Sequence, residues 1–233
     1  MHSLKNIIQS AAHLFYPHIC TGCGSDILPK DNLLCARCYT NLPLTDYAKH
    51  PNNPVEEIFW GRIKLNAAHS EFYFDKEALI QHLVHQLKYK GDRSIGLYLG
   101  EMLGRTLINS KRFNAIDALI PLPLYPEKER KRGYNQAAII CEGVSQVMNK
   151  PVVTGKLLRK RYTETQTKKH RAERWENVEG SFVVTDESDL KGKHLLLVDD
   201  VVTTGATLEA AGMMLLKIPS VTLSIATLTI ASK

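Results

Sequence analysis

The clearest structural signal in the sequence is the run Leu195-Leu196-Leu197-Val198-Asp199-Asp200-Val201-Val202-Thr203-Thr204-Gly205-Ala206-Thr207. Its four leading residues are apolar without polar alternation, which is the pattern of a strand buried on both faces. Two adjacent carboxylates follow. A short loop with hydroxyl groups and a glycine then leads into an apolar segment with helical spacing. A buried strand that runs through such a loop into a helix is the repeating unit of a parallel α/β sheet.

The loop of this stretch has the chemistry of a phosphate site. Gly205 lets the backbone approach an anion, and the loop N–H groups together with the helix N-terminus form an anion-binding nest. Hydroxyl donors are added by Thr203, Thr204 and Thr207. Carboxylates repel phosphate, so the Asp pair is expected to face sugar hydroxyls or a hydrated Mg²⁺. The alternative is that the Asp and Thr side chains only cap the helix.

The rest of the chain alternates strands and helices. We expect strands at 67–74, at 116–120, from Val152, at 194–198 and at 221–230, and helices at 76–89, 94–108, 134–148 and 207–216. The glycines of 94–108 weaken that helix prediction. Strands separated by helices of this length predict a mostly parallel sheet flanked by helices, with ligands beyond the carboxyl ends of the strands.

Four cysteines near the N-terminus form the pattern C-x₂-C-x₁₁-C-x₂-C. They are Cys20, Cys23, Cys35 and Cys38. Two such pairs can deliver four thiolates to one structural Zn²⁺ and leave no open position for catalysis. Two disulfides or a redox CxxC are the alternatives. The fifth cysteine, Cys141, lies among apolar residues of a predicted helix and is expected to be a buried free thiol.

The chain divides into two expected parts. Residues 1–50 comprise an amphipathic first helix (1–16) and the Cys₄ zinc module, and residues 51–233 form the α/β domain after a linker at His50–Pro54. Polar residues interrupt any apolar export signal, and no apolar run is long enough to span a membrane. We therefore expect a cytoplasmic protein, whose reducing surroundings favour metal binding over disulfides.

The formal net charge of +6 is concentrated in one segment. Eight basic and two acidic residues lie between Lys156 and Arg174, and a second basic cluster spans Glu127 to Arg132. Such runs are commonly solvated surface. Beside a phosphate motif they instead favour contact with an anionic ligand.

Beyond these single features, the chain resembles the ComF family along nearly its whole length. The thirteen-residue run resembles the phosphoribosyl pyrophosphate (PRPP) motif of type I phosphoribosyltransferases. The remaining matching motifs, in order after the Cys pairs, are Leu87-Lys88-Tyr89-Lys90-Gly91-Asp92, Pro121-Leu122-Pro123, Arg132-Gly133-Tyr134-Asn135-Gln136, Thr165-Gln166-Thr167, and Glu173-Arg174-Trp175-Glu176-Asn177-Val178 with Phe182. The resemblance implies a zinc segment joined to a phosphoribosyltransferase-like domain, and some members of the family are tied to natural competence.

The resemblance also implies roles for individual residues. PRPP with Mg²⁺ would contact Asp199, Asp200, Val201, Thr203, Thr204, Gly205, Ala206 and Thr207, with the two carboxylates as the catalytic pair. A pyrophosphate loop would include Pro121, Leu122, Pro123, Arg130, Lys131 and Arg132, whose cations suit a leaving pyrophosphate. A lid within 159–180 would include Gln166, Lys168, Lys169, Arg171 and Arg174.

Three functions are compatible with these features. The first is a phosphoribosyltransferase with an undetermined acceptor. The second is a PRPP-responsive scaffold in DNA uptake, and the third is a protein that binds single-stranded DNA through its basic segment. The Asp pair and phosphate loop support ligand binding in the first two and do not separate them.

Overall fold

The computed structural model describes residues 19–28, 32–74, 79–160 and 181–231. The predicted first helix (1–16) lies outside these ranges. The same holds for the lid residues Gln166, Lys168, Lys169, Arg171 and Arg174.

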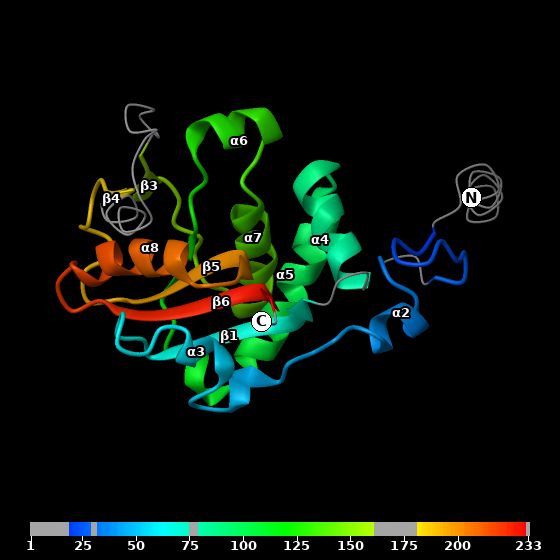
Figure 1. The fold of residues 1–233 in the computed structure, drawn as a ribbon, viewed down its shortest axis with the longest axis horizontal. Coiled ribbons are helices and arrows are strands. Elements are labelled where there is room, and N and C mark those ends of the chain that lie inside the picture. Colours follow the sequence, from blue (N-terminus) through cyan, green and yellow to red (C-terminus); the bar gives the residue numbers. More distant parts are fainter. Residues whose placement is uncertain (1–18, 29–31, 75–78, 161–180, 232–233) are drawn as a thin grey trace, which may run out of the picture.

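The central sheet is parallel, as predicted, but it has four strands, one fewer than the five expected from the sequence (Figure 1). Their order is β1 (Ala67–Phe74), β6 (Thr222–Ala231), β5 (His194–Val202) and β2 (Ala118–Pro121). The two middle strands are almost wholly buried, which explains why the β5 sequence shows no polar alternation. Because all four strands are parallel, their carboxyl ends meet at one edge of the sheet.

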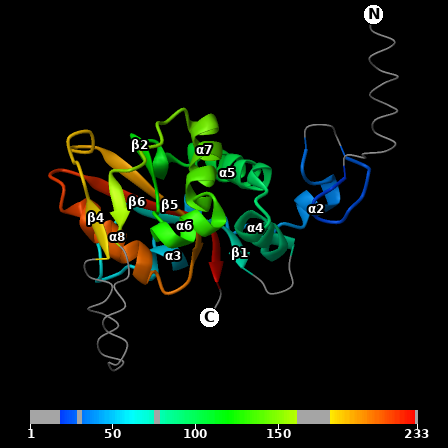
Figure 2. The same cartoon turned by 90° about the horizontal axis from the view of Figure 1, so that it is seen from above.

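Helices cover both faces of the sheet (Figure 2). Neighbouring strand residues belong to different apolar cores, one on each face. Leu196 and Val198 face the core formed with α4 (Leu79–Tyr89), α5 (Arg93–Ile108) and α7 (Gln136–Met148). Leu195 and Leu197 face the core formed with α3 (Pro54–Glu57) and α8 (Ala206–Leu216). Because successive side chains of a strand point to opposite faces of the sheet, β5 contributes to the apolar core on each face.

Helices α5 and α7 approach each other at backbone distance through glycines. A Cβ on Gly100 would lie 2.3 Å from the Ile140 carbonyl oxygen, and one on Gly143 would lie 2.2 Å from the Leu97 carbonyl oxygen. The glycines that weaken local helix propensity are therefore needed for close packing. The predicted helices at these positions are confirmed.

We expect Gly143→Ala to lower the free energy of unfolding by about 2 kcal/mol, because the added methyl forces two helix backbones apart. Gln146→Ala, an exposed position on the same helix, is expected to stay within about 0.5 kcal/mol of the parent. Urea unfolding of both variants tests this. A Gly143→Ala protein as stable as the parent would show that the helices do not constrain each other.

The structure differs from the sequence expectations in three elements. The basic cluster is not a loop but helix α6 (Pro126–Arg132), which Pro126 starts and whose acidic first turn and basic last turn match the helix dipole. Strand β5 does not end at Val198, because pairing with β6 continues through the Asp pair to Val202. No strand begins at Val152, which forms a single bridge with Leu119.

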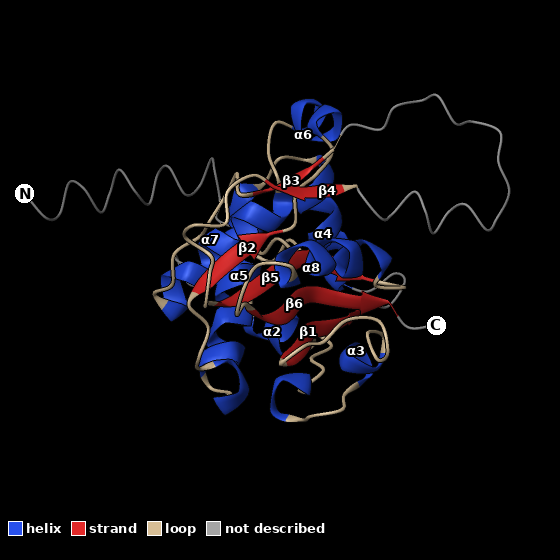
Figure 3. Cartoon of the chain, turned by 90° about the vertical axis from the view of Figure 1, so that its left-hand side faces the viewer, coloured by secondary structure: helices blue, strands red, loops and turns tan. Residues whose placement is uncertain are grey.

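An antiparallel pair, β3 (Leu157–Arg159) with β4 (Phe182–Val184), was not predicted (Figure 3). Each strand has three residues, too few to show a sequence period. Figure 3 shows this pair and α6 at the same end of the molecule. Arg159, the last residue of β3, pairs with Phe182, the first residue of β4. The two ends of the intervening stretch therefore lie side by side.

The cysteine-bearing segment packs on the sheet domain. It contains α2 (Ala36–Thr40), and its buried Leu34 and Leu42 belong to the same apolar core as α4 and α5. Two short 3₁₀ turns, η1 (Tyr47–Lys49) and η2 (Lys111–Phe113), lie beside the sheet. Leu44 pairs with Phe72 at the β1 edge. Of the helices described, none combines the length and apolar character needed to cross a bilayer.

Candidate ligand site and metal cluster

The run with the clearest structural signal lines a pocket of about 210 Å³ at the carboxyl end of β5. All nine residues from Asp199 to Thr207 contribute to its wall. Leu122 and Pro123, which follow β2, also line it. The structure therefore brings the predicted phosphate loop, the Asp pair and part of the predicted pyrophosphate loop to one cavity.

The predicted phosphate loop, Thr203 to Thr207, leads into the N-terminus of α8. Gly205 has φ +74°, a left-handed conformation, and a Cβ there would lie 2.5 Å from Ile58 Cγ2. No side chain caps α8, which leaves its first N–H groups for a ligand and argues against a pure capping role for the Asp and Thr residues. Arg62 braces the loop by donating to the Thr204 carbonyl at 2.8 Å and pairing with Glu209 at 2.5 Å.

The two carboxylates lie in different surroundings. Asp200 is 2% exposed, and its Oδ2 lies 2.7 Å from Lys88 Nζ as an ion pair, although no aligned hydrogen bond reaches that oxygen among the described residues. Burial raises the pKa of Asp199 well above its ordinary value, and the neighbouring Asp200 charge raises it further. Positive charge from Lys88 and Arg159 acts in the opposite direction. A hydroxyl donor or a cation would satisfy this pair.

Two cations of the site were missed by the sequence reasoning. Lys88 reaches Asp200 from α4, although its motif had been noted only as a family match. Arg159, at the end of β3, lines the pocket with its guanidinium 3.9 Å from the Tyr125 ring centroid and 5.2 Å from that of Phe182. Stacking of this kind holds a guanidinium in place while its charge still faces the pocket.

The cations of α6 do not line this pocket. Arg130 and Lys131 are exposed, and Arg130 pairs with Glu127 at 3.6 Å. Arg132 hydrogen-bonds the side chain of Gln136, which is buried and does line the pocket. Pro121, the last residue of β2, is buried beneath the site. Of the six residues predicted for the pyrophosphate loop, the pocket wall contains Leu122 and Pro123.

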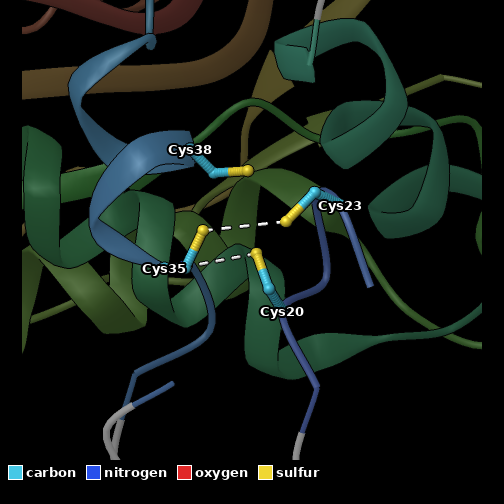
Figure 4. Close-up of side chains that lie close together, drawn as sticks. All are labelled: Cys20, Cys23, Cys35 and Cys38. Carbon is cyan, nitrogen blue, oxygen red and sulfur yellow. Dashed lines mark hydrogen bonds between the residues drawn. The ribbon is translucent and has the colours of Figure 1, made fainter. Parts of the chain in front are cut away.

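The four N-terminal cysteines form one cluster (Figure 4). Their sulfur atoms all lie within 4.8 Å of one another, and Cys23 Sγ is 3.7 Å from Cys35 Sγ. Four thiolates at about 2.3 Å from a tetrahedral Zn²⁺ are about 3.8 Å apart. The cluster therefore has the donor set and spacing to hold a metal ion such as zinc.

The thiols of this cluster are not equivalent. Burial acts to raise the pKa of Cys20, but backbone N–H donors, including that of Cys35 at 3.2 Å, outweigh it and lower this pKa to about 6. Burial and the neighbouring thiols raise the pKa of Cys38 to about 12. Four thiols this close favour a bound cation, which deprotonates coordinating thiols outright. Cys141 lies apart in α7, fully buried and free, as predicted.

Several known proteins are similar to this chain. A family model described as "phosphoribosyl transferase domain" matches residues 135–233. Competence protein F of Haemophilus influenzae is 26% identical over 88% of this chain and 93% of its own length. The DNA utilization protein YhgH of Escherichia coli K12 is 28% identical over 85% and 84%. Competence protein ComFC of Bacillus subtilis is 33% identical over 42% of this chain and 38% of its own.

The chain was also matched to solved structures, at low similarity. Glutamine phosphoribosylpyrophosphate amidotransferase from B. subtilis matches with a TM-score of 0.41 at 18% identity, over 60% of this chain and 30% of that one. Hypoxanthine phosphoribosyltransferase from Trypanosoma cruzi matches with a TM-score of 0.37 at 15% identity, over 59% and 68%.

Proposed function

Because this chain is a ComF family protein with a phosphoribosyltransferase domain and an N-terminal four-cysteine cluster, we propose that it binds PRPP with Mg²⁺ and transfers the phosphoribosyl group to a nitrogen acceptor. The observation that carries the proposal is the pocket in which the nine residues Asp199 to Thr207 form one wall. A phosphorylated sugar fits this wall because phosphate acceptors meet N–H and hydroxyl donors at one end and sugar hydroxyls meet carboxylates at the other.

Each part of the pocket has a task in this proposal. The loop from Thr203 to Thr207 holds the 5-phosphate at the N-terminus of α8. Asp199 and Asp200 accept hydrogen bonds from the ribose hydroxyls, and Lys88 keeps the buried Asp200 paired. Arg159, which lines the same pocket as the residues after β2 and β5, would face the pyrophosphate group. When bound, Mg²⁺ would neutralise charge on the pyrophosphate, and the Asp pair offers the hard oxygen donors that it prefers.

Catalysis in this site would rest on positioning and charge. Negative charge develops on pyrophosphate as it leaves C1, and fixed cations stabilise such charge without reorganising. Arg159 is held for this by its two aromatic neighbours. The proposed role of Arg130, Lys131 and Arg132 needs a shift of α6 toward the ligand, since these residues lie off the pocket wall.

A second function is favoured by the names of the relatives. Proteins called competence and DNA utilization proteins match most of this chain. The alternative is therefore a PRPP-responsive scaffold without turnover, or a protein that binds single-stranded DNA through its basic segment. Both alternatives retain the Cys₄ cluster as a structural zinc site or docking module.

A pyrophosphate-release assay tests the proposed function. Calorimetry should first show PRPP binding in the presence of Mg²⁺ and none in its absence. Pyrophosphate release with a panel of bases, amines and single-stranded DNA then separates enzyme from scaffold. Tight PRPP binding without release for any acceptor supports the scaffold, and absence of PRPP binding would contradict both.

The segment 159–180 gives a further prediction, based on its sequence. We expect PRPP with Mg²⁺ to protect its Lys and Arg sites from trypsin, as a lid that closes over pyrophosphate would. If the segment instead binds single-stranded DNA, DNA should protect it, with affinity falling steeply as salt rises. Alanine at Lys168, Lys169 and Arg171 would then weaken DNA binding equally for every sequence. Protection by DNA alone would overturn the lid assignment.

A further inference from the structure

A second pocket, of about 500 Å³, opens beside the phosphate loop. It lies at the carboxyl ends of β1 and β6, which run side by side up to the pair Phe74 and Ala231 (Figure 2). Thr203 lines both this pocket and the one that contains the Asp pair. The two pockets are therefore neighbours along the edge of the sheet where parallel strands bind ligands.

The strand order gives this second pocket a role. The loop expected to hold pyrophosphate follows β2, and the Asp pair lies on β5, next to β2. Displacement at C1 requires the nucleophile to approach from the side opposite the leaving group. With the order β1-β6-β5-β2, the side of β5 away from β2 is where β6 and β1 end. The second pocket opens at that place.

The walls of this pocket suit a flat ring that carries N–H groups. The rings of Tyr47 and Tyr73 meet edge to face at 5.7 Å, and their hydroxyls hydrogen-bond at 2.8 Å. Ile58 and Ile230 add apolar surface. The charged side chain among the described lining residues is Glu57, whose carboxylate accepts hydrogen bonds from N–H donors and repels anions. An aminated heterocycle satisfies these walls better than a carboxylated one.

We propose that this pocket, with Tyr73 and Glu57 as its recognition residues, receives the acceptor and selects a nitrogen heterocycle bearing amino groups. The proposal rests on the proposed function. A ring nitrogen of the acceptor forms a bond to C1 of PRPP, and the C1–O bond breaks. Pyrophosphate leaves with that electron pair, and the proton of the acceptor nitrogen passes to water.

Adenine and orotate serve as test probes, because one is aminated and the other carboxylated. PRPP binding with Mg²⁺ is measured first by calorimetry. Each probe is then titrated by saturation-transfer NMR into protein that holds ribose 5-phosphate, which has no leaving group and cannot react. We expect adenine to bind more tightly than orotate. Tyr73→Leu should weaken adenine binding about tenfold, the effect of losing one aromatic contact to a base. Glu57→Gln should reduce the preference for adenine over orotate.

Trp60→Leu is the matched control, since Trp60 is an exposed aromatic residue that lines a different pocket. PRPP affinity should stay within about twofold of the parent in all three variants. If the parent binds PRPP but not adenine, or if Tyr73→Leu binds adenine as tightly as Trp60→Leu, the acceptor pocket is refuted while the proposed function stands. If PRPP itself does not bind, the proposed function fails and this inference with it.

Discussion

Replacing Asp199 and Asp200 together by asparagine is expected to abolish PRPP binding. Each carboxylate would lose a charge-assisted hydrogen bond to a ribose hydroxyl, worth about 1.5–3 kcal/mol. The two losses together weaken binding by more than about a hundredfold. Calorimetry with PRPP and Mg²⁺ measures the effect. Asp189→Asn is the control, because this carboxylate is exposed and does not line the pocket. Unaltered affinity in the double variant would mean that the acids are only structural.

The melting temperature distinguishes a loss of PRPP binding from a loss of folding in these variants. Burial raises the pKa of Asp199, so the folded state favours its protonated form. Folding stability is then fully present below the ordinary carboxyl pKa and is lost as pH rises through the raised pKa. At neutral pH part or all of this contribution is lost, whereas asparagine stays neutral at every pH, so Asp199→Asn alone is expected to keep or raise the melting temperature. A loss of PRPP affinity in a protein with an unchanged or higher melting temperature would identify a binding role.

Cys35→Ser is expected to remove the metal from the N-terminal cluster. The parent should contain one equivalent of zinc per chain, bound by four thiolates as the sulfur spacing indicates. Removal of one ligand leaves three thiolates, and the binding free energy that supports the local fold is lost. The adjacent Leu34 and Leu42, buried against α4 and α5, should then become exposed, which lowers the melting temperature. Elemental analysis of protein purified under reducing conditions, with thermal melts, measures both effects.

Cys141→Ser is the matched control for this experiment. Cys141 is fully buried, as Cys20 nearly is, but it belongs to α7 and the helical core. Metal content should stay at one equivalent, whatever the effect on stability. A parent protein that is folded and free of metal would rule out the zinc site.

The sequence predicted the fold where local patterns are strong. The uninterrupted apolar residues of β5 and the helical spacing of α4, α7 and α8 predicted a parallel α/β sheet, because each element must bury a recognisable face. The sequence also predicted that the four cysteines form one cluster and that residues Asp199 to Thr207 line one site. Residues a few positions apart in a CxxC pair or a loop are necessarily close in space. Residues outside the described ranges, including the predicted lid, keep their roles as predictions.

The sequence alone was enough to predict the parallel sheet, the grouping of the four cysteines and the grouping of residues 199–207. The tertiary structure decided what depends on contacts between distant segments. Lys88 and Asp200 are 112 positions apart, and they meet only because α4, which packs on α5 and β1, carries Lys88 to the end of β5. No local sequence pattern predicts this contact. The position of Arg159 between Tyr125 and Phe182 also depends on tertiary packing, as do the glycine contacts of α5 with α7. The walls of the second pocket likewise come from separate parts of the chain. Sites formed by residues close in sequence can be predicted from their local pattern. The partners of a buried charge depend on how distant helices and strands pack together.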